Sequence, residues 1–419
     1  MKKGAFFAAI DVGTSKVCTL VGRQDAAREM QVVGVGLVPS RGMRKGMVSN
    51  LSDVQQVVQA SVREAEAQAG VSISSAYVGL TGSHINYINS RASLDNRRYE
   101  NPVGGGDVDQ VIQACYAQSA ASGGRVLHVI PRNFAVDGHW GVRNPVGMYT
   151  STLEVESHVV RGDSSPIDNL VEALHRAGVT PRGLVLEPLA SAEAVLVGEE
   201  REMGVVLVDI GGGTSDMSIF LDGNIWHTGI IPVGGFQFTQ DVSIAFTTPF
   251  GAAEEAKVRY GNAIPEMIDA EEMIRLPGFG ESMVYKVPRQ KLCQVLHERM
   301  EELLRIVMVQ IKESGLESAP PGGLVLTGGS AKMPGLEQLA RGMFPGPVRI
   351  GVPKAAAWVP RNLEDPSFAT ALGLLLWDAR HETGNGSSGN GNGANGHGGA
   401  ARLSGFKQWF TNLAQRVHI

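Results

Sequence analysis

Two glycine-containing turns share one arrangement of residues that is able to bind phosphate. In each turn an apolar stretch ends in an aspartate, and glycine then leads to a hydroxyl residue. The two segments are Asp11-Val12-Gly13-Thr14-Ser15 and Asp209-Ile210-Gly211-Gly212-Gly213-Thr214. Glycine lets backbone N–H groups approach phosphate oxygens with no Cβ in between, and the hydroxyls add donors. The pair predicts a phosphate-binding site, although either turn alone would also suit an ordinary hairpin.

Three charged residues extend this chemistry. Lys16 follows the first turn and can reach a phosphate oxygen as a point charge. Asp11 and Asp209 can hold Mg²⁺ between them through its waters, because Mg²⁺ prefers oxygen ligands and keeps part of its hydration shell. Neither turn has the spacing of a Walker A loop or of a Rossmann fingerprint, so the pattern favours a different class of nucleotide site.

Two further segments are candidates for contact with the base and ribose of a nucleotide. Gly328, Gly329 and Ser330 follow an apolar stretch, and glycines there let a flat base lie against the backbone. An ordinary strand-to-helix turn is the alternative. Glu254 and Lys257 are three residues apart on a predicted helix and share a face, from which they can hydrogen-bond ribose and base. A surface ion pair is the alternative for this pair.

The elements that must hold these turns alternate between strand and helix. Residues 5–22 predict two strands around the first turn, and residues 205–221 predict two strands around the second. Helices are predicted over three longer ranges, the first of them capped by Ser52: 53–68, 168–177 and 290–315. This alternation indicates an α/β architecture, and 419 residues suffice for two lobes with an insertion.

Composition narrows the class of protein. Apolar residues make up 43% and charged residues 19%, and the net charge of −5 gives no basis for general nucleic-acid binding. The cysteines, Cys18, Cys115 and Cys293, are odd in number and have no metal-ligand spacing, which favours a reduced cytoplasmic location. The first apolar run is too short for a signal peptide, and no stretch approaches the roughly 20 apolar residues of a membrane span.

The end of the chain differs in composition from the rest. Residues 384–399 are almost entirely glycine, asparagine and serine, so we expect a disordered linker spanning about 20–24 Å. Residues 402–419 then predict an amphipathic helix whose apolar side chains fall within an arc of about 120°. That face carries Leu403, Phe406, Trp409, Phe410, Leu413 and Val417.

The terminal helix also has charges suited to a lipid surface. Lys407 and Arg416 lie at the two edges of the apolar arc, where their stems can snorkel and their charges can meet anionic headgroups. A helix of this length is too short to cross a bilayer, so it is predicted to lie in the interface. Docking on the protein's own body is the alternative, which the flexible linker disfavours.

The order of these elements resembles the actin, Hsp70 and hexokinase superfamily. In this resemblance the two glycine turns are phosphate loops and Gly328-Gly329 belongs to an adenosine motif. Residues 187–192 resemble its first connecting helix, in which Glu187 would orient the attacking water, and residues 369–374 its second. The resemblance implies a two-lobed ATPase fold that binds ATP with Mg²⁺, with Asp11, Glu187 and Asp209 as candidate catalytic residues and slow hydrolysis at most.

Within that superfamily the chain is most similar to the FtsA family of bacterial cell-division proteins, over residues 4–419. Three features carry the similarity: an insertion over about 82–161, the segment 253–261, and the linker with its terminal helix. The implied domain ranges are 1–82 and 164–200 for the first lobe, 83–163 for the inserted subdomain, 201–382 for the second lobe, 383–401 for the linker and 402–419 for the membrane helix.

The FtsA resemblance also implies partners and a location. Such proteins form actin-like protofilaments and tether polymers of FtsZ to the inner face of the cytoplasmic membrane at the division site. The tether would bind the FtsZ C-terminal peptide, with Arg299 as its basic contact, although Arg299 equally suits a solvated helix surface. Other division proteins would bind the inserted subdomain.

Three other classes fit less well. A small-molecule kinase of the superfamily needs a substrate aspartate in the cleft and gives no reason for the terminal helix. A chaperone ATPase needs a substrate-binding β-domain after residue 380, where this chain has linker and helix. A rod-shape actin homologue is closer but usually lacks the insertion.

Overall fold

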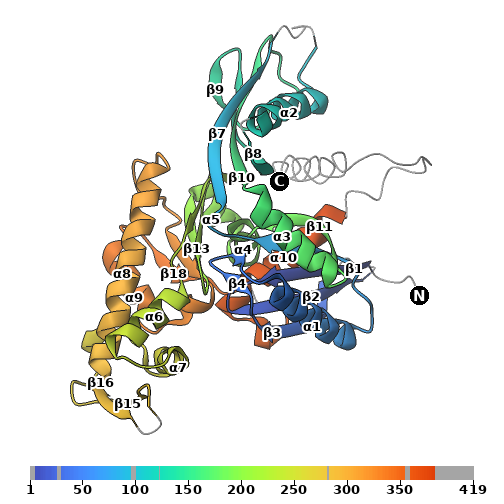
Figure 1. Ribbon diagram of the computed structural model, residues 1–419. Helices are drawn as coiled ribbons and strands as arrows, with labels where there is room; N and C mark the ends of the chain where they lie inside the picture. Colours follow the sequence, from blue (N-terminus) through green and yellow to red (C-terminus); the bar gives the residue numbers. More distant parts are fainter. Residues whose placement is uncertain are drawn as a thin grey trace.

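The computed structural model shows two lobes side by side, with a third unit projecting from one end (Figure 1). It describes residues 5–382 apart from 26–29, 96–100, 122, 281–282 and 354–358, and side chains up to residue 379. The predicted linker and terminal amphipathic helix lie outside the described residues. Among the helices that are described, none combines the length and the apolar character needed to cross a bilayer.

The first lobe is built on a five-stranded sheet in the order β11-β6-β1-β2-β3. β1, β2 and β3 are antiparallel neighbours, whereas β6 and β11 continue the sheet in parallel. The predicted pair of strands around the first glycine turn is therefore confirmed. The strands are β1 (Ala5–Val12), β2 (Lys16–Gln24), β3 (Met30–Pro39), β6 (Ser75–Leu80) and β11 (Thr180–Leu186).

Two helices cover one face of this sheet, α1 (Leu51–Ala69) and α3 (Ser164–Arg176). The predicted cap of α1 is wrong. Asn50 is the N-cap, and its side-chain oxygen accepts hydrogen bonds from the N–H groups of Ser52 and Asp53 at 3.1 and 3.2 Å. α3 begins four residues before its predicted start, since Pro166 is tolerated in a first helical turn.

The second lobe repeats the strand order of the first. Its sheet runs β14-β13-β12-β17-β18, again with three antiparallel strands followed by two parallel ones. The second glycine turn therefore lies between β12 and β13 as the first lies between β1 and β2. The strands are β12 (Val205–Ile210), β13 (Ser215–Leu221), β14 (Asn224–Ile231), β17 (Leu324–Thr327) and β18 (Val348–Ile350).

Helices and a hairpin complete the second lobe. The predicted long helix is confirmed as α8, whose apolar side packs against the sheet together with α6, α7 and α9. The hairpin β15–β16 projects at the end far from the inserted unit (Figure 1). The bounds are α6 (Gly235–Ala245), α7 (Phe250–Tyr260), β15 (Met273–Pro277), β16 (Val284–Pro288), α8 (Arg289–Glu313) and α9 (Leu336–Met343).

The inserted unit has a sheet of its own, in the order β7-β10-β8-β9, with α2 on one face. It contacts the second lobe through His158 of β10, whose Nε2 lies 2.8 Å from the Thr228 hydroxyl of β14. The elements are β7 (Ile85–Leu94), α2 (Gly105–Ala121), β8 (Arg125–Val136), β9 (His139–Val142) and β10 (Leu153–Gly162).

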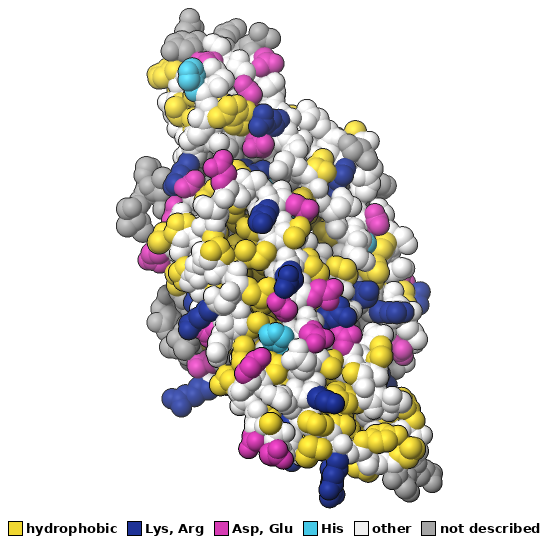
Figure 2. Space-filling model, turned by 90° about the vertical axis from the view of Figure 1, so that its left-hand side faces the viewer, with side chains coloured by type: hydrophobic (Ala, Val, Ile, Leu, Met, Phe, Trp, Pro, Cys, Tyr) yellow, Lys and Arg dark blue, Asp and Glu magenta, His cyan; other side chains and the backbone are white. Residues whose placement is uncertain are grey.

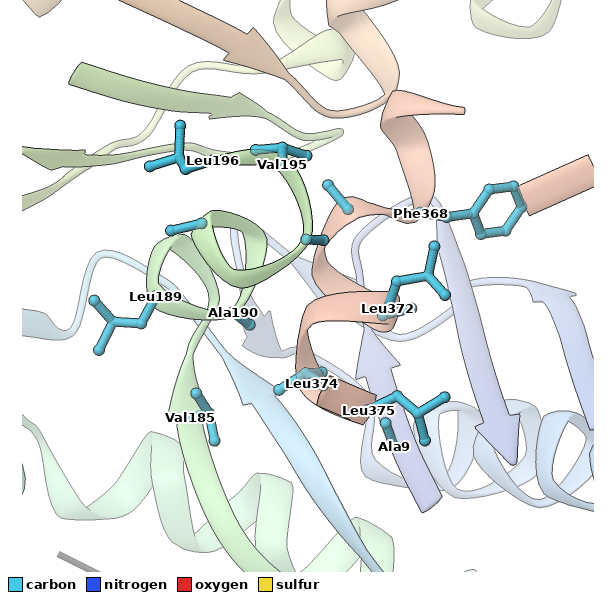
Figure 3. Close-up of a cluster of buried hydrophobic side chains, with 14 of the residues drawn as sticks. Ala9, Val185, Leu189, Ala190, Val195, Leu196, Phe368, Leu372, Leu374 and Leu375 are labelled. Atoms are coloured by element: carbon cyan, nitrogen blue, oxygen red, sulfur yellow. The ribbon is translucent and has the colours of Figure 1, made fainter. Parts of the chain in front are cut away.

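Two helices pack against each other between the lobes, α4 (Glu187–Val195) and α10 (Ala369–Glu382), as Figure 3 shows. They approach so closely that a Cβ on Gly373 would overlap the carbonyl oxygen of Ala190. α10 is also fixed to the first lobe. The buried Asp378 accepts the Ala8 N–H of β1 and a guanidinium N–H of Arg182 of β11, each at 3.0 Å.

We predict that Gly373→Ala destabilises the protein by about 1–3 kcal/mol, because the added methyl forces α4 and α10 apart. Gly342→Ala is the matched control. Gly342 lies in α9 with open space around its Cβ position, and the change there should stabilise by about 0.5–1 kcal/mol through helix propensity. Chemical denaturation of both variants measures the difference, and equal midpoints would contradict the close packing.

Candidate functional site

A cleft of about 690 Å³ lies between the two lobes. It is lined by segments of both sheets and by the helices beneath them. All the residues that the sequence analysis assigned to catalysis or to nucleotide binding line this one cleft. They are Asp11, Gly13, Thr14, Ser15, Lys16, Glu187, Asp209, Gly211, Gly212, Gly213, Thr214, Glu254, Lys257, Gly328, Gly329 and Ser330.

The two glycine turns face each other across the cleft. A Cβ on Gly213 would lie 2.6 Å from the Thr14 hydroxyl oxygen, and one on Gly212 would lie 3.2 Å from the Ser15 Cβ. Side chains at these positions of the second turn would crowd the first turn. Glycine is therefore needed there both to let the two turns approach each other and to leave the backbone open to a ligand. The closeness of the turns means that a single phosphate chain can meet both.

Gly328 has a second requirement for glycine. Its φ of +88° is in the left-handed region, and a Cβ there would overlap Oδ1 of Asp209. Gly329, by contrast, would place a Cβ in open space with only the Ser367 Cβ at 3.8 Å. The loop after β17 therefore presents bare backbone toward the cleft, as the sequence analysis expects of a surface for a flat base.

Three buried carboxyl groups line the cleft, on Asp11, Glu187 and Asp209, and a fourth, on Asp216, is buried beside them. Burial is the main cause that raises the pKa of each, to about 7 for Asp11 and about 8 for Asp216, and well above the ordinary value for Glu187. The neighbouring carboxylates raise the pKa values of Asp11, Glu187 and Asp216 further. A bound cation would favour the ionised form of such a group of acids, and their oxygens are suitable ligands for it.

Asp209 makes its hydrogen bonds to the two helices between the lobes. Its Oδ2 accepts from the Ser191 hydroxyl of α4 at 2.5 Å and from the Thr370 hydroxyl of α10 at 3.0 Å. These two bonds oppose the effect of burial on the Asp209 pKa. The other oxygen, Oδ1, lies beside Gly328, which has no side chain to cover it. The two hydroxyls therefore hold the carboxylate through Oδ2.

Asp216, which the sequence analysis did not select, joins the two lobes. Its Oδ1 accepts from the hydroxyl of Thr81 in the first lobe at 2.5 Å, and its Oδ2 accepts from Thr214 at 3.3 Å. A signal for it was present in the sequence. In the hairpin around residues 211–214 Asp216 is the cross-strand partner of Asp209, a pairing that follows from the length of the turn.

Lys16 reaches the cleft but contacts the segment before α10. Its ammonium donates to the Ser367 hydroxyl at 3.0 Å and lies 3.8 Å from the centre of the Phe368 ring. Burial lowers the Lys16 pKa, and the Asp11 carboxylate opposes this effect. The charge is therefore poorly hydrated and available to an anion in the cleft.

Glu254 and Lys257 share a face of α7, as predicted, and their charges meet at 2.8 Å. Lys257 is buried, and its ammonium also donates to the Gly235 carbonyl at 3.0 Å and to the Thr239 hydroxyl at 2.9 Å. Lys257 is thus a buried part of the cleft wall, whereas the Glu254 side chain, which also lines the cleft, is 45% exposed.

Arg299 lies outside the cleft, on α8. Its guanidinium contacts both carboxylate oxygens of Asp241 on α6, at 2.6 and 3.2 Å, and Glu302 at 2.5 Å. Hydrogen bonding to Asp241 raises the Arg299 pKa. The charge that the sequence analysis assigned to an acidic peptide is therefore already balanced by two acids of the chain.

No group of three His, Cys, Asp or Glu side chains among the described residues is arranged to bind a metal ion directly. Asp11 and Asp209 fit a cation held through its waters, as Mg²⁺ is commonly held beside phosphate. The buried acids at the cleft supply the charge for this arrangement.

We predict that the wild type and Asp216→Asn differ in how their stability depends on pH when nucleotide and divalent cation are absent. As the pH rises from 6 to 8, the free energy of unfolding of the wild type should fall relative to that of the variant. The folded state keeps the Asp216 proton up to a pKa of about 8, and the unfolded chain releases it near 3.8. The stabilisation is complete below pH 3.8 and is lost as pH rises through about 8. The relative loss should be about 2 kcal/mol, and parallel pH profiles in chemical denaturation would contradict it.

Comparison with known proteins identifies the architecture. A family model described as "Cell division protein FtsA" matches residues 206–373, and one described as "SHS2 domain inserted in FTSA" matches residues 82–161. The PilM–PilN type IV pilus biogenesis complex has a chain of similar structure, with a TM-score of 0.64 and 17% identity over 89% of this chain and 98% of that one.

Two further proteins complete the comparison. MreB5 of Spiroplasma citri, solved bound to ADP, has a TM-score of 0.54 and 11% identity over 91% of this chain and 99% of that one. The predicted α/β, actin-like fold with an inserted subdomain is confirmed. A "Cell division protein FtsA" of Pseudomonas aeruginosa is 39% identical over 384 residues, 91% of each chain. The chain belongs to the FtsA family of cell-division proteins.

Proposed function

We propose that this FtsA-family protein binds ATP with Mg²⁺ in the interlobe cleft, assembles with copies of itself and tethers FtsZ polymers to the inner face of the cytoplasmic membrane. The observation that carries the proposal is the meeting of two equivalent glycine turns, one from each duplicated sheet, in the same cleft as the Gly328–Gly329 backbone. A ligand with a phosphate chain and a flat base matches this arrangement.

The residues fit this nucleotide in kind and in position. Backbone N–H groups and hydroxyls of the two turns, with Lys16, would bind the phosphates. Gly328, Gly329 and Ser330 would face the base, while Glu254 and Lys257 would contact ribose or base. Asp11 and Asp209 would hold Mg²⁺ through water, and the ion would neutralise phosphate charge when bound. MreB5, of similar fold, is described as bound to ADP, which supports the proposal.

Glu187 is the residue that would act on water. It lies at the start of α4, is buried and lines the cleft. A carboxyl group there can orient a water toward the terminal phosphate. Burial raises the pKa of the Glu187 carboxyl well above its ordinary value. At most slow hydrolysis of ATP is expected, as the family resemblance implies.

We predict that Gly329→Val weakens ATP binding about tenfold or more without loss of stability. The new side chain would extend into open cleft space, where it competes with the base for volume. Gly251→Ala, an exposed change in α7 with nothing near its Cβ position, is the control. Calorimetric titration with Mg·ATP measures both, and unchanged affinity of the valine variant would contradict the assignment of this loop.

Self-association is supported by apolar side chains at opposite ends of the molecule. Around the β15–β16 hairpin, Phe279 and Val284 are 70% and 59% exposed, and on the inserted unit Tyr149 is 57% exposed. Figure 2 shows hydrophobic side chains gathered at the hairpin end, and mixed charges along the rest of that face. Different patches at two ends suit a head-to-tail contact, which propagates into a filament when the ends do not close.

Membrane attachment would come from the terminal helix, and FtsZ attachment from the face of α8 near Arg299. A peptide carboxylate that binds Arg299 would have to compete with Asp241 and Glu302. A single interfacial helix binds reversibly, so assembly of several copies would add avidity at the membrane.

The division site is the location that this function requires, and the inserted unit would be open to other division proteins. The domain ranges set from the sequence stay a prediction.

We predict that Trp409→Glu releases the full chain from anionic liposomes, because it places a charge on the apolar face of the helix that the sequence predicts over residues 402–419. Gln415→Glu is the matched control, since it adds the same charge opposite the centre of that face. Co-sedimentation with vesicles containing anionic lipid measures the difference. If both variants pellet as the wild type does, the terminal helix is not the anchor.

A further inference from the structure

We propose that Ser191 and Thr370 are positioning residues that join the Asp209 carboxylate to both helices of the hinge, so that cation binding at Asp209 and the angle between the lobes are linked. This inference rests on the proposed binding of a nucleotide with Mg²⁺ in the cleft. It assigns a role to two hydroxyls that neither the phosphate turns nor the base-binding loop requires.

The three side chains form one buried cluster. The Ser191 hydroxyl lies 2.5 Å and the Thr370 hydroxyl 3.0 Å from the same oxygen of Asp209, and the two hydroxyl oxygens lie 3.0 Å apart. Ser191 is fully buried, and Asp209 and Thr370 nearly so. A buried carboxylate that loses a donor bears the cost of its desolvation, so both hydroxyls are needed where they are.

The two hydroxyls have two hydrogens for the three contacts of this cluster. Each hydroxyl carries a single hydrogen, and an ionised carboxylate only accepts. When both hydroxyls donate to Oδ2 of Asp209, neither has a hydrogen left for the other. In the alternative arrangement one hydroxyl donates to the other across their 3.0 Å contact, and only the second donates to Oδ2. In either arrangement Oδ2 of Asp209 accepts at least one hydroxyl hydrogen, so the three side chains form one hydrogen-bonded cluster.

The two donors come from the two elements that connect the lobes. α4 follows directly on β11 of the first-lobe sheet and leads through α5 (Gly198–Met203) to β12 of the second. α10 is fixed to β1 and β11 by Asp378 at its far end. The bare backbone at Gly373 lets the helices touch at Ala190, the neighbour of Ser191. Thr370 is therefore on a helix attached to the first lobe, whereas Ser191 is on a helix that also contacts the second lobe, where Ser218 of β13 donates to the Pro188 carbonyl at 3.3 Å.

Asp209 itself belongs to the second lobe, at the end of β12. A rotation of the second lobe about α4 and α10 would change the distances between its carboxylate and both hydroxyls. A cation that binds the Asp209 carboxylate through water would in turn favour one angle between the lobes. Coupling of this kind is reciprocal, so the hydroxyls should matter for the metal-dependent part of nucleotide binding.

The test compares variants that remove one hydroxyl at a time. Thr370→Val keeps the shape of the side chain without its donor, Ser191→Ala removes the other donor, and Thr370→Ser restores a hydroxyl. Thr19→Val is the control, because Thr19 is an equally buried threonine of the first-lobe sheet, bonded to Ser61 at 2.7 Å. Binding of a fluorescent ATP analogue is measured on the full chain with Mg²⁺ and with EDTA.

The expected result is a loss of the gain in affinity that Mg²⁺ gives. Thr370→Val and Ser191→Ala should each reduce this gain about tenfold, Thr370→Ser should recover most of it, and Thr19→Val should leave it unchanged. If the wild type binds without any effect of Mg²⁺, the proposed function fails. If the wild type depends on Mg²⁺ and both hydroxyl-free variants keep that dependence, this inference is wrong.

A second measurement reads the hinge directly. All three native cysteines are buried, so spin labels attach selectively to cysteines placed at the exposed positions Ala60 on α1 and Lys291 on α8. Mg·ATP should narrow and shift the distance distribution in the wild type and do so less in Thr370→Val at saturating nucleotide. An identical shift in both proteins would show that Thr370 does not couple the site to the hinge.

Discussion

The Asp209 carboxylate lies where the second-lobe sheet, α4 and α10 meet, and its burial leaves it dependent on the protein for hydrogen bonds. One oxygen is satisfied by Ser191 and Thr370, and the other is left toward Gly328, where any side chain would collide with it. The close packing of α4 on α10 at Gly373 sets both donors in place. The arrangement of Asp209 and its two donors therefore depends on a close contact between α4 and α10 that only glycine at position 373 permits.

Duplication of the strand order explains how a single cleft gains two phosphate-binding turns. Each lobe begins with a hairpin whose turn lies at the edge facing its counterpart, and the two turns come close enough that Gly213 lies against Thr14. Burial of four carboxyl groups at the cleft makes these groups costly to ionise without a cation. The two turns supply hydrogen-bond donors for phosphate, and the buried acids supply oxygen ligands for a cation. A nucleotide with its metal ion requires both.

The sequence predicted what depends on local pattern. Asp11, Gly13, Asp209 and the glycines that follow it were identifiable because the same pattern, an apolar strand that ends in aspartate and turns through glycine, occurs twice in the chain. Ser191, Thr370 and Thr81 were not, since an isolated hydroxyl in a helix or loop gains its role only from a carboxylate distant in the chain. The balance of Arg299 by Asp241 likewise depends on how α6 packs on α8. Asn50, two residues before Ser52, is the α1 cap because its backbone is extended and Ser52 is already helical, a difference in backbone conformation that residue type alone does not indicate.

Amide hydrogen exchange of the full chain, with and without Mg·ATP, tests most directly whether one nucleotide joins the two lobes. The account predicts that Mg·ATP slows exchange together in residues 11–16, 209–214 and 328–330, which come from both lobes and line the same cleft. Protection confined to one lobe, or exchange unchanged in all three segments, would contradict it.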